Sequence, residues 1–205
     1  MGVALAEAAL ARGARVTLVV GMTSVPLPDD ATIVRVETTA QMRDAVLDLV
    51  ESADVLIMAA AVADFRPKRA ATKKLSRGEG LTIELEPTED ILAGAAAAAR
   101  ADGARRPRTV LVGFAAETGS LERAAEKLRR KGVDLLVAND VSEAGSGFGT
   151  DTNRVTILAP DAPEQSLPLL SKRAAADAIL DRIGAVLDDR DAAKQTEPMR
   201  QEIGR

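Results

Sequence analysis

The sequence contains no cysteine, histidine, tyrosine or tryptophan. Without cysteine the chain has no disulfide bond and no thiolate nucleophile, which is typical of a cytoplasmic protein. Without histidine and cysteine it has no His-dependent triad and no Cys/His zinc site, and without tyrosine it lacks the Tyr–Lys pair of short-chain dehydrogenases. Lys, Arg, Asp, Asn and oriented backbone groups remain. This set suits phosphoryl or nucleotidyl transfer by positioning and charge stabilisation.

A strong charge imbalance and long apolar runs are missing too. The formal net charge of −4 disfavours a nucleic-acid surface as the main function. No apolar run reaches the roughly 18 residues that a membrane span requires, and the first residues lack the basic region and cleavage site of a signal peptide. The 205 residues, 46% of them hydrophobic, suffice for one sizeable α/β domain with a full core.

The most informative stretch is ADVLIMAAAVADFRP, residues 53–67. Its apolar run at 55–59 predicts a strand of a parallel sheet, buried on both faces. Small residues then lead into a charged tip that contains Asp64, and such small side chains let a ligand approach the backbone. In open α/β sheets ligands bind at the carboxyl ends of the strands. A core strand followed by an ordinary solvated loop explains the same pattern.

Helical and strand patterns alternate along the chain. The expected helices cover residues 2–12, 41–52, 88–100, 120–131 and 170–187. The expected strands cover residues 15–20, 32–36, 55–59, 81–86, 109–112, 133–137 and 154–160. This rhythm predicts a Rossmann-like, doubly wound, mainly parallel sheet. The strand at 81–86 alternates apolar and polar residues, so we expect it in a small β arm at about 68–86.

The expected boundaries follow from the ends of this pattern. The chain opens on a helix, whereas doubly wound folds normally begin with a strand whose turn binds phosphate. We therefore expect that a first strand and its loop are missing before Met1. Residues 1–188 are expected to form one nucleotide-binding domain, and the polar residues 189–205 a disordered tail.

The three phenylalanines are the only aromatic residues. Phe65, Phe114 and Phe148 all fall outside the expected helices and strands, although large aromatic side chains usually belong to cores. Each could cover a local apolar gap. Taken together, they favour flat faces for a planar ligand, with Phe65 and Phe114 at the same edge of the sheet.

Six motifs, in order, carry a resemblance to a known family. They are MAAAVADFRP (58–67), KKLSR (73–77), EDIL (89–92), GFAAET (113–118), KLRRKGVDLLVAND (127–140) and GFGTDTN (147–153). This set resembles phosphopantothenate–cysteine ligase, an enzyme of coenzyme A biosynthesis that many bacteria fuse behind an FMN-dependent decarboxylase. The resemblance covers nearly all of residues 1–188, but the family's Ser-Ser-Gly-Lys turn and an upstream catalytic asparagine are not in this sequence.

The resemblance implies a ligation in two steps. CTP activates the carboxylate of 4′-phosphopantothenate as an acyl-cytidylate and releases pyrophosphate. The amine of L-cysteine then displaces CMP. Mg²⁺ would neutralise the triphosphate, and the enzyme would be a cytoplasmic homodimer that shares the arm. No metal-ligating residue is identified in this sequence.

The resemblance also assigns roles to individual residues. Lys74 would be the mobile catalytic lysine, although the family's Lys-x-Lys-Lys reads Lys-Leu-Ser-Arg here and leaves Lys73 as the alternative. Ala60 and Ala61 would contact the acid substrate. The nucleotide would contact Met58, Ala59 and Ala60 through their backbone, Asp64 at its ribose or base, the EDIL segment (Glu89, Asp90, Ile91 and Leu92) at its base, Phe114, and Lys127 and Lys131 at its phosphates. Glu89 stands where the family commonly has proline.

Two other functions remain open. A Rossmann-type nucleotide-binding oxidoreductase or regulatory module would share this fold, but no Gly-x-Gly-x-x-Gly stands at a strand–helix junction. A chain without its first strand could also be a non-catalytic or poorly folding fragment, because a sheet deprived of an inner strand exposes its edges. Thermal unfolding with nucleotides added separates these alternatives from the ligase.

Overall fold

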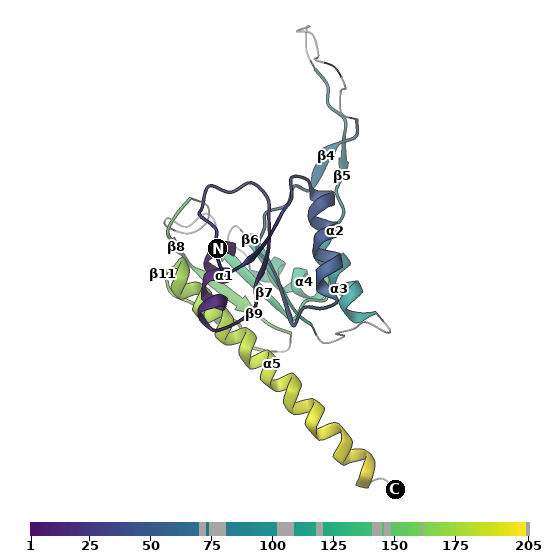
Figure 1. The fold of residues 1–205 in the computed structure, drawn as a ribbon, viewed down its shortest axis with the longest axis vertical. Helices are drawn as coiled ribbons and strands as arrows, with labels where there is room; N and C mark the ends of the chain where they lie inside the picture. The colour runs from purple at the N-terminus through teal and green to yellow at the C-terminus, as the bar shows by residue number, and fades with distance from the viewer. Residues whose placement is uncertain are drawn as a thin grey trace.

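The computed structural model describes residues 1–69, 73, 81–101, 109–117, 121–140, 145, 149–160 and 162–203. Its central sheet has five strands in the order β10-β9-β7-β6-β3 (Figure 1). Three neighbours, β3 (Val55–Met58), β6 (Val110–Glu117) and β7 (Leu135–Asp140), are parallel. On the far side of β7, β9 (Val155–Leu158) pairs antiparallel with β7, and β10 (Gln165–Ser166) pairs antiparallel with β9. The expected mainly parallel α/β sheet is confirmed.

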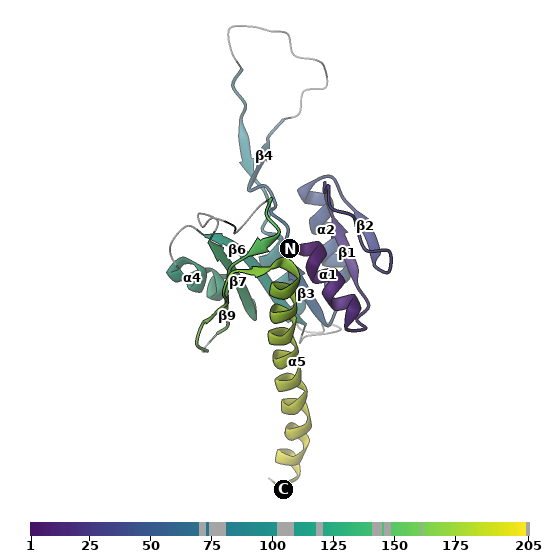
Figure 2. The same ribbon diagram turned by 90° about the vertical axis from the view of Figure 1, so that its left-hand side faces the viewer.

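Three smaller strand pairs surround this sheet. β1 (Thr17–Val20) and β2 (Thr32–Arg35) form a parallel pair. β8 (Thr152–Asn153) pairs antiparallel with β11 (Leu170–Ser171). β4 (Phe65–Pro67) and β5 (Leu85–Pro87) form an antiparallel ribbon at the base of the arm, which projects from the body of the domain (Figures 1 and 2).

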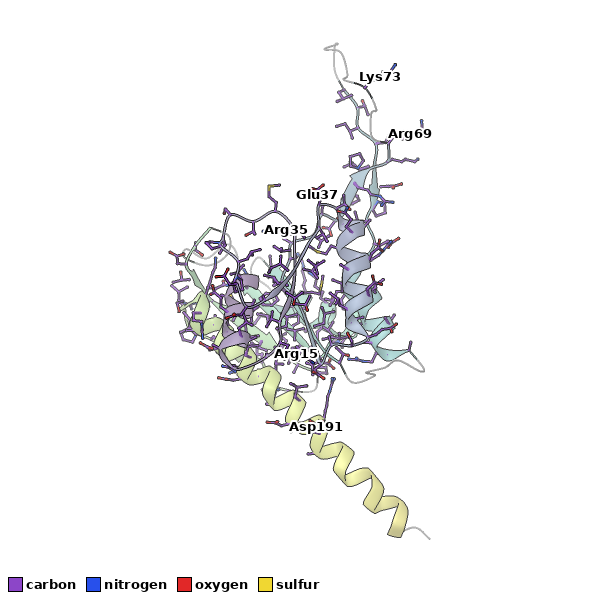
Figure 3. All side chains as sticks on the ribbon, viewed as in Figure 1. Arg15, Arg35, Glu37, Arg69, Lys73 and Asp191 are labelled. Atoms are coloured by element: carbon purple, nitrogen blue, oxygen red, sulfur yellow. The ribbon has the colours of Figure 1, made fainter. Side chains whose placement is uncertain are left out.

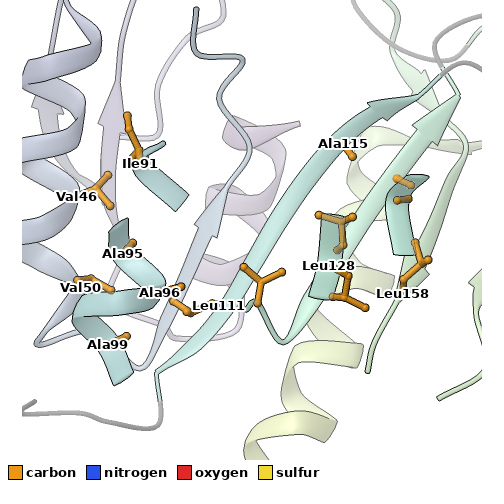
Figure 4. Close-up of a cluster of buried hydrophobic side chains, with 14 residues drawn as sticks. Val46, Val50, Ile91, Ala95, Ala96, Ala99, Leu111, Ala115, Leu128 and Leu158 are labelled. Atoms are coloured by element: carbon orange, nitrogen blue, oxygen red, sulfur yellow. The ribbon is translucent and has the colours of Figure 1, made fainter. Parts of the chain in front are cut away.

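Helices pack on both faces of the central sheet. One core cluster joins β6 and β7 to α2 (Thr39–Val50), α3 (Ile91–Arg100) and α4 (Leu121–Lys131) (Figure 4). The other cluster joins the same strands to α1 (Gly2–Ala11) and α5 (Lys172–Ile203). This is the doubly wound arrangement expected from the sequence.

The strands show why both faces need helices. In β6, Leu111 and Ala115 belong to the first cluster, whereas Val110 and Val112 belong to the second. Successive side chains of a strand point to opposite faces, so a run of consecutive apolar residues must be covered on both sides. β3 differs from the expectation, because all four of its residues are only partly buried. Among the described strands it forms the edge of the five-stranded sheet and pairs with β6 alone.

Two phenylalanines lie in strands, which corrects their expected position in loops. Phe65 is the first residue of β4, and Phe114 lies in the middle of β6, which continues to Glu117 instead of ending at Val112. Pairing with β7 explains the extension, because Phe114 lies opposite Val137 and the ladder runs on for three further residue pairs. Phe148 lies outside the described residues.

The starts of α2 and α3 illustrate how helices are capped. Thr38 and Thr39 are the two residues expected to cap α2, and Thr38 does so. Its hydroxyl accepts a hydrogen bond from the Gln41 N–H, and the Gln41 side chain accepts one from the Thr38 N–H. This reciprocal pair is a capping box. The start of α3 differs from the expected start at residue 88. Asp90 caps this helix by accepting a hydrogen bond from the Ala93 N–H at 3.1 Å.

The last helix continues beyond its expected end at Leu187. The backbone of α5 is helical to Ile203, where the sequence predicts a disordered tail from residue 189. One contact that supports the longer helix is the ion pair of Arg190 with Asp134, which lies just before β7. The residues that follow include Ala, Lys, Gln, Glu and Arg, which favour helix. Over the part of the chain that the structure describes, no helix combines the length and the apolar character needed to cross a membrane.

Candidate nucleotide site

The end of β3 and the middle of β6 lie side by side. Met58, the last residue of β3, is in register with Gly113 of β6. Beyond them, Ala59 and Phe114 both pack against the core cluster that includes α1 and α5. Ala60 and Ala61 follow and are exposed. The structure thus brings together Ala59 and Phe114, and leaves the alanine backbone accessible to a ligand.

The loop after β3 is tied to the EDIL segment by two hydrogen bonds from Thr88. The Thr88 N–H donates to the Asp64 carbonyl at 2.9 Å, and its hydroxyl donates to the Ala63 carbonyl at 2.6 Å. The Asp64 side chain is exposed. Residues that lie 24 or more positions apart in the sequence therefore meet at the base of the arm.

Asp90 connects the EDIL segment to α4. Its Oδ1 caps α3, and its Oδ2 accepts a hydrogen bond from the Nζ of Lys131. Partial burial alone would raise the pKa of Asp90, but the hydrogen bonds from Lys131 and Ala93 outweigh it and hold that pKa below its usual value. The side chain of Lys131 is 16% exposed. Lys131, which is expected at the nucleotide phosphates, is the last residue of α4. Its largely buried side chain reaches Asp90 at the start of α3.

Glu89 connects the same segment to α2. It is paired with Nη1 of Arg43, whose Nε and Nη2 both donate to Asp44 Oδ1, at 2.9 and 2.7 Å. The hydrogen bonds to Glu89 and Asp44 raise the pKa of Arg43 above its ordinary value. A shallow crevice at this contact is lined by Thr39, Ala40, Arg43, Arg66, Thr88 and Glu89.

The last two residues of the segment are held by apolar packing. Ile91 is buried in the first core cluster, and Leu92 packs against that cluster. A Cβ added to Gly113 would lie 2.7 Å from Leu92 Cδ2 and 3.0 Å from Leu136 Cδ1. These distances are shorter than ordinary van der Waals contacts, so the absence of a side chain at Gly113 lets Leu92 lie directly on β6.

The other expected residues that the structure describes lie on the arm, on α4 and on β6. Lys74 lies outside the described residues. Lys73 is exposed on the arm, away from the body of the domain (Figure 3). Lys127 is partly buried on α4, one turn before Lys131, as their spacing of four predicts. Phe65 is 59% exposed at the base of the arm, whereas Phe114 packs in the body.

The contact between Arg43 and Glu89 is not indicated by the sequence. Glu89 is 46 positions away from Arg43, and the charges around Arg43 read as an ordinary solvated face of a helix. The pattern of α2 predicts that Met42, Val46, Leu47 and Val50 share a face, and all four lie in or against the first core cluster. Nothing local in the sequence points from Arg43 to the start of α3.

A metal ion that accompanies a nucleotide needs few ligands from the protein, because phosphate oxygens supply much of its coordination. In the described part of the chain, no group of three or more acidic, His or Cys side chains is placed to hold an ion. Mg²⁺ in nucleotide sites is usually held by phosphate oxygens with one or two carboxylates. Asp64 supplies an exposed carboxylate near the EDIL segment, which meets this smaller requirement.

Known proteins resemble this chain over most of its length. Residues 1–187 match the family described as DNA/pantothenate metabolism flavoprotein C-terminal domain. The Coenzyme A biosynthesis bifunctional protein CoaBC of Bacillus subtilis is 44% identical over 189 residues, which cover 91% of this chain and 45% of that protein. The protein of the same name from Mycobacterium tuberculosis is 47% identical over 190 residues, covering 89% of this chain and 45% of its own length.

A solved structure agrees with these sequence matches. The C-terminal domain of a Coenzyme A biosynthesis bifunctional protein CoaBC superimposes with a TM-score of 0.74 at 40% identity, over 92% of this chain and 84% of that chain. The chain spans less than half of the length of the two bifunctional relatives. It covers 84% of the separately solved C-terminal domain.

Proposed function

Because the chain belongs to the DNA/pantothenate metabolism flavoprotein C-terminal domain family, we propose that it is a phosphopantothenate–cysteine ligase domain of coenzyme A biosynthesis. It joins 4′-phosphopantothenate to L-cysteine with CTP as the activating nucleotide. The relatives are named as bifunctional proteins, and we propose that the second activity is an FMN-dependent decarboxylase fused to this domain in the natural protein.

The observation that carries the proposal is the meeting of three separate segments. The alanines after β3, the EDIL segment and the last turn of α4 converge through the contacts of Thr88, Asp90 and Leu92. The family resemblance implies that each of these segments contacts the nucleotide. Backbone groups after β3 would lie under the nucleotide, the EDIL segment would contact the base, and Lys131 with Lys127 would hold phosphates.

The proposed chemistry depends on positioning and charge. A carboxylate oxygen of the acid attacks the α-phosphorus of CTP, the bond to the β-phosphate oxygen breaks, and pyrophosphate leaves. The cysteine amine then attacks the acyl carbon, an amide forms, CMP leaves and the amine loses a proton. Lys74 would stabilise the charge that develops near the α-phosphate. Ala60 and Ala61 would hold the acid, and Mg²⁺ bound with CTP would supply charge neutralisation.

The decisive measurement is nucleotide binding. CTP with Mg²⁺ is expected to raise the unfolding temperature of the chain, because a ligand at 100 times its dissociation constant adds roughly 2.7 kcal/mol to the free energy of unfolding. ATP and NADPH are the matched comparisons. Stabilisation by NADPH in place of CTP would favour an oxidoreductase. The ligation itself is tested by product formation: pyrophosphate release should require the acid, and CMP release should require cysteine as well.

The arm supports a second part of the proposal, a homodimer. Phe65 of β4 lies opposite Pro87 of β5, and Pro67 lies opposite Leu85, so these four side chains share one face of the ribbon. Phe65 and Leu85 are 59% and 57% exposed, and Ile83 continues the apolar series at 59%. A projecting two-stranded ribbon with an apolar face is marginally stable alone. We propose that the arm of a second copy covers it.

Substitution in the arm tests the dimer. Ile83→Asp is expected to give a particle with the mass of one chain, because a charge would be buried against the partner's apolar face. Light scattering after size-exclusion chromatography measures this mass. Thr82→Asp, one residue earlier on the opposite face, is the control and should keep the mass of two chains. A single-chain mass for the unaltered protein, or no change with Ile83→Asp, would contradict the arm-mediated dimer.

A further inference from the structure

The EDIL segment is held from two sides by neighbouring carboxylates. Glu89 is paired with Arg43 of α2, and Asp90 is paired with Lys131 of α4. The two carboxylates are consecutive in the sequence, whereas their cations lie on different helices. Glu89 precedes the first turn of α3, where the backbone is not yet held by helical hydrogen bonds. The hydrogen bond of the preceding Thr88 N–H to the Asp64 carbonyl and the side-chain contact of Glu89 therefore both help to hold this part of the segment.

Arg43 is itself in a fixed orientation. Its Nε and Nη2 donate to Asp44, which leaves Nη1 directed at Glu89. A guanidinium held by three of its nitrogen atoms presents its remaining donors in a set geometry. α2 is anchored as well, since Val46 and Val50, three and seven residues further along, are buried beside Ile91 in the first core cluster. Arg43 thus lies on the side of α2 that faces α3.

We propose that Arg43 is a positioning residue for the nucleotide, acting through Glu89 to hold the EDIL segment where the base of CTP is contacted. This inference rests on the proposed function. Through Arg43 the segment is joined to α2, whose first residues, Thr39 and Ala40, line the same crevice. Through Asp90 the segment is joined to Lys131, which would hold the phosphates of the nucleotide. The segment is thereby fixed with respect to both ends of the nucleotide.

The test is the dissociation constant of CTP, measured by titration calorimetry on this chain and its variants. Arg43→Gln and Glu89→Gln should each weaken CTP binding about fivefold, the most that an exposed ion pair normally contributes. The double variant should be no weaker than either single one, because both substitutions remove the same contact. Arg43→Lys keeps the charge but not the guanidinium geometry, so it should recover only part of the affinity.

A purely structural role predicts a different result. In that case Arg43→Gln lowers the unfolding temperature of the free protein but leaves the CTP dissociation constant within twofold, which overturns the proposal. Arg173→Gln is the matched control, because it removes a similarly exposed ion pair with Asp177 on α5 and should leave CTP binding unchanged. If the unaltered chain does not bind CTP, the proposed function fails together with this inference. Equal binding by the unaltered chain and Arg43→Gln overturns the role of Arg43 alone.

Discussion

Asp134→Ala is expected to lower the free energy of unfolding by about 2 kcal/mol, because it removes a charged acceptor from a part-buried backbone N–H and from two arginines. The Asp134 side chain is 17% exposed and lies just before β7. Its Oδ2 accepts hydrogen bonds from the Leu111 N–H at 2.7 Å and from Arg100 at 3.0 Å. Its Oδ1 is paired with Arg190. The substitution leaves two arginines facing each other and a backbone N–H without its acceptor.

Urea unfolding of the two proteins measures this difference, and Asp177→Ala is the matched control. Asp177 also contacts two arginines, Arg12 and Arg173, but its side chain is 39% exposed. Exposed pairs contribute 0–1 kcal/mol, so this control should lose roughly 1 kcal/mol or less. Equal losses in the two variants would contradict the structural role assigned to Asp134.

The same contact defines how far the folded domain extends. Asp134 joins the end of α3, the central sheet and α5, through Arg100, Leu111 and Arg190. Residues 1–188, the domain predicted from the sequence, would omit Arg190. The predicted boundary depended on where apolar periodicity ends. A polar contact beyond that point leaves no such pattern, so we propose that the folded unit includes at least the turn of α5 that carries Arg190.

Local patterns predicted the elements of this fold well. The capping box of Thr38 and Gln41 lies within four residues, and the buried runs at 110–112 and 135–137 specify strands covered on both faces. Element ends were predicted less well where a distant partner decides them. Thr88 and Asp90 are both good helix caps, and α3 starts at Asp90 because Thr88 is engaged with the loop after β3.

The candidate site was inferred mainly from the resemblance and only partly from the residues themselves, and its residue roles stay predictions. The small residues after β3 indicated a ligand at the carboxyl end of a strand. The spacing of Lys127 and Lys131 indicated one helix face, which the structure confirms. The pairing of Lys131 with Asp90 and of Arg43 with Glu89 spans 41 and 46 positions. Only the folded chain brings such partners together, so no local pattern could specify them.

Lys74→Gln is expected to reduce the rate of ligation about 10²–10³-fold, the usual effect of removing one group that stabilises transition-state charge. The substitution keeps a polar side chain of similar length and removes a single positive charge. CTP binding should weaken much less than the rate, because the charge on the α-phosphate grows only as pyrophosphate leaves. Single-turnover formation of CMP separates the chemical step from binding.

The neighbouring Lys73→Gln is the control that decides between the two lysines. Lys73 is exposed on the arm and shares the charge and sequence environment of Lys74. If Lys74 is the working residue, Lys73→Gln should retain the rate within about threefold, in line with the small effect of a surface charge. A large loss with Lys73→Gln alone would transfer the role to Lys73. Full turnover in both variants would contradict a catalytic role for either lysine, because no charge of this pair would then be needed at the leaving pyrophosphate.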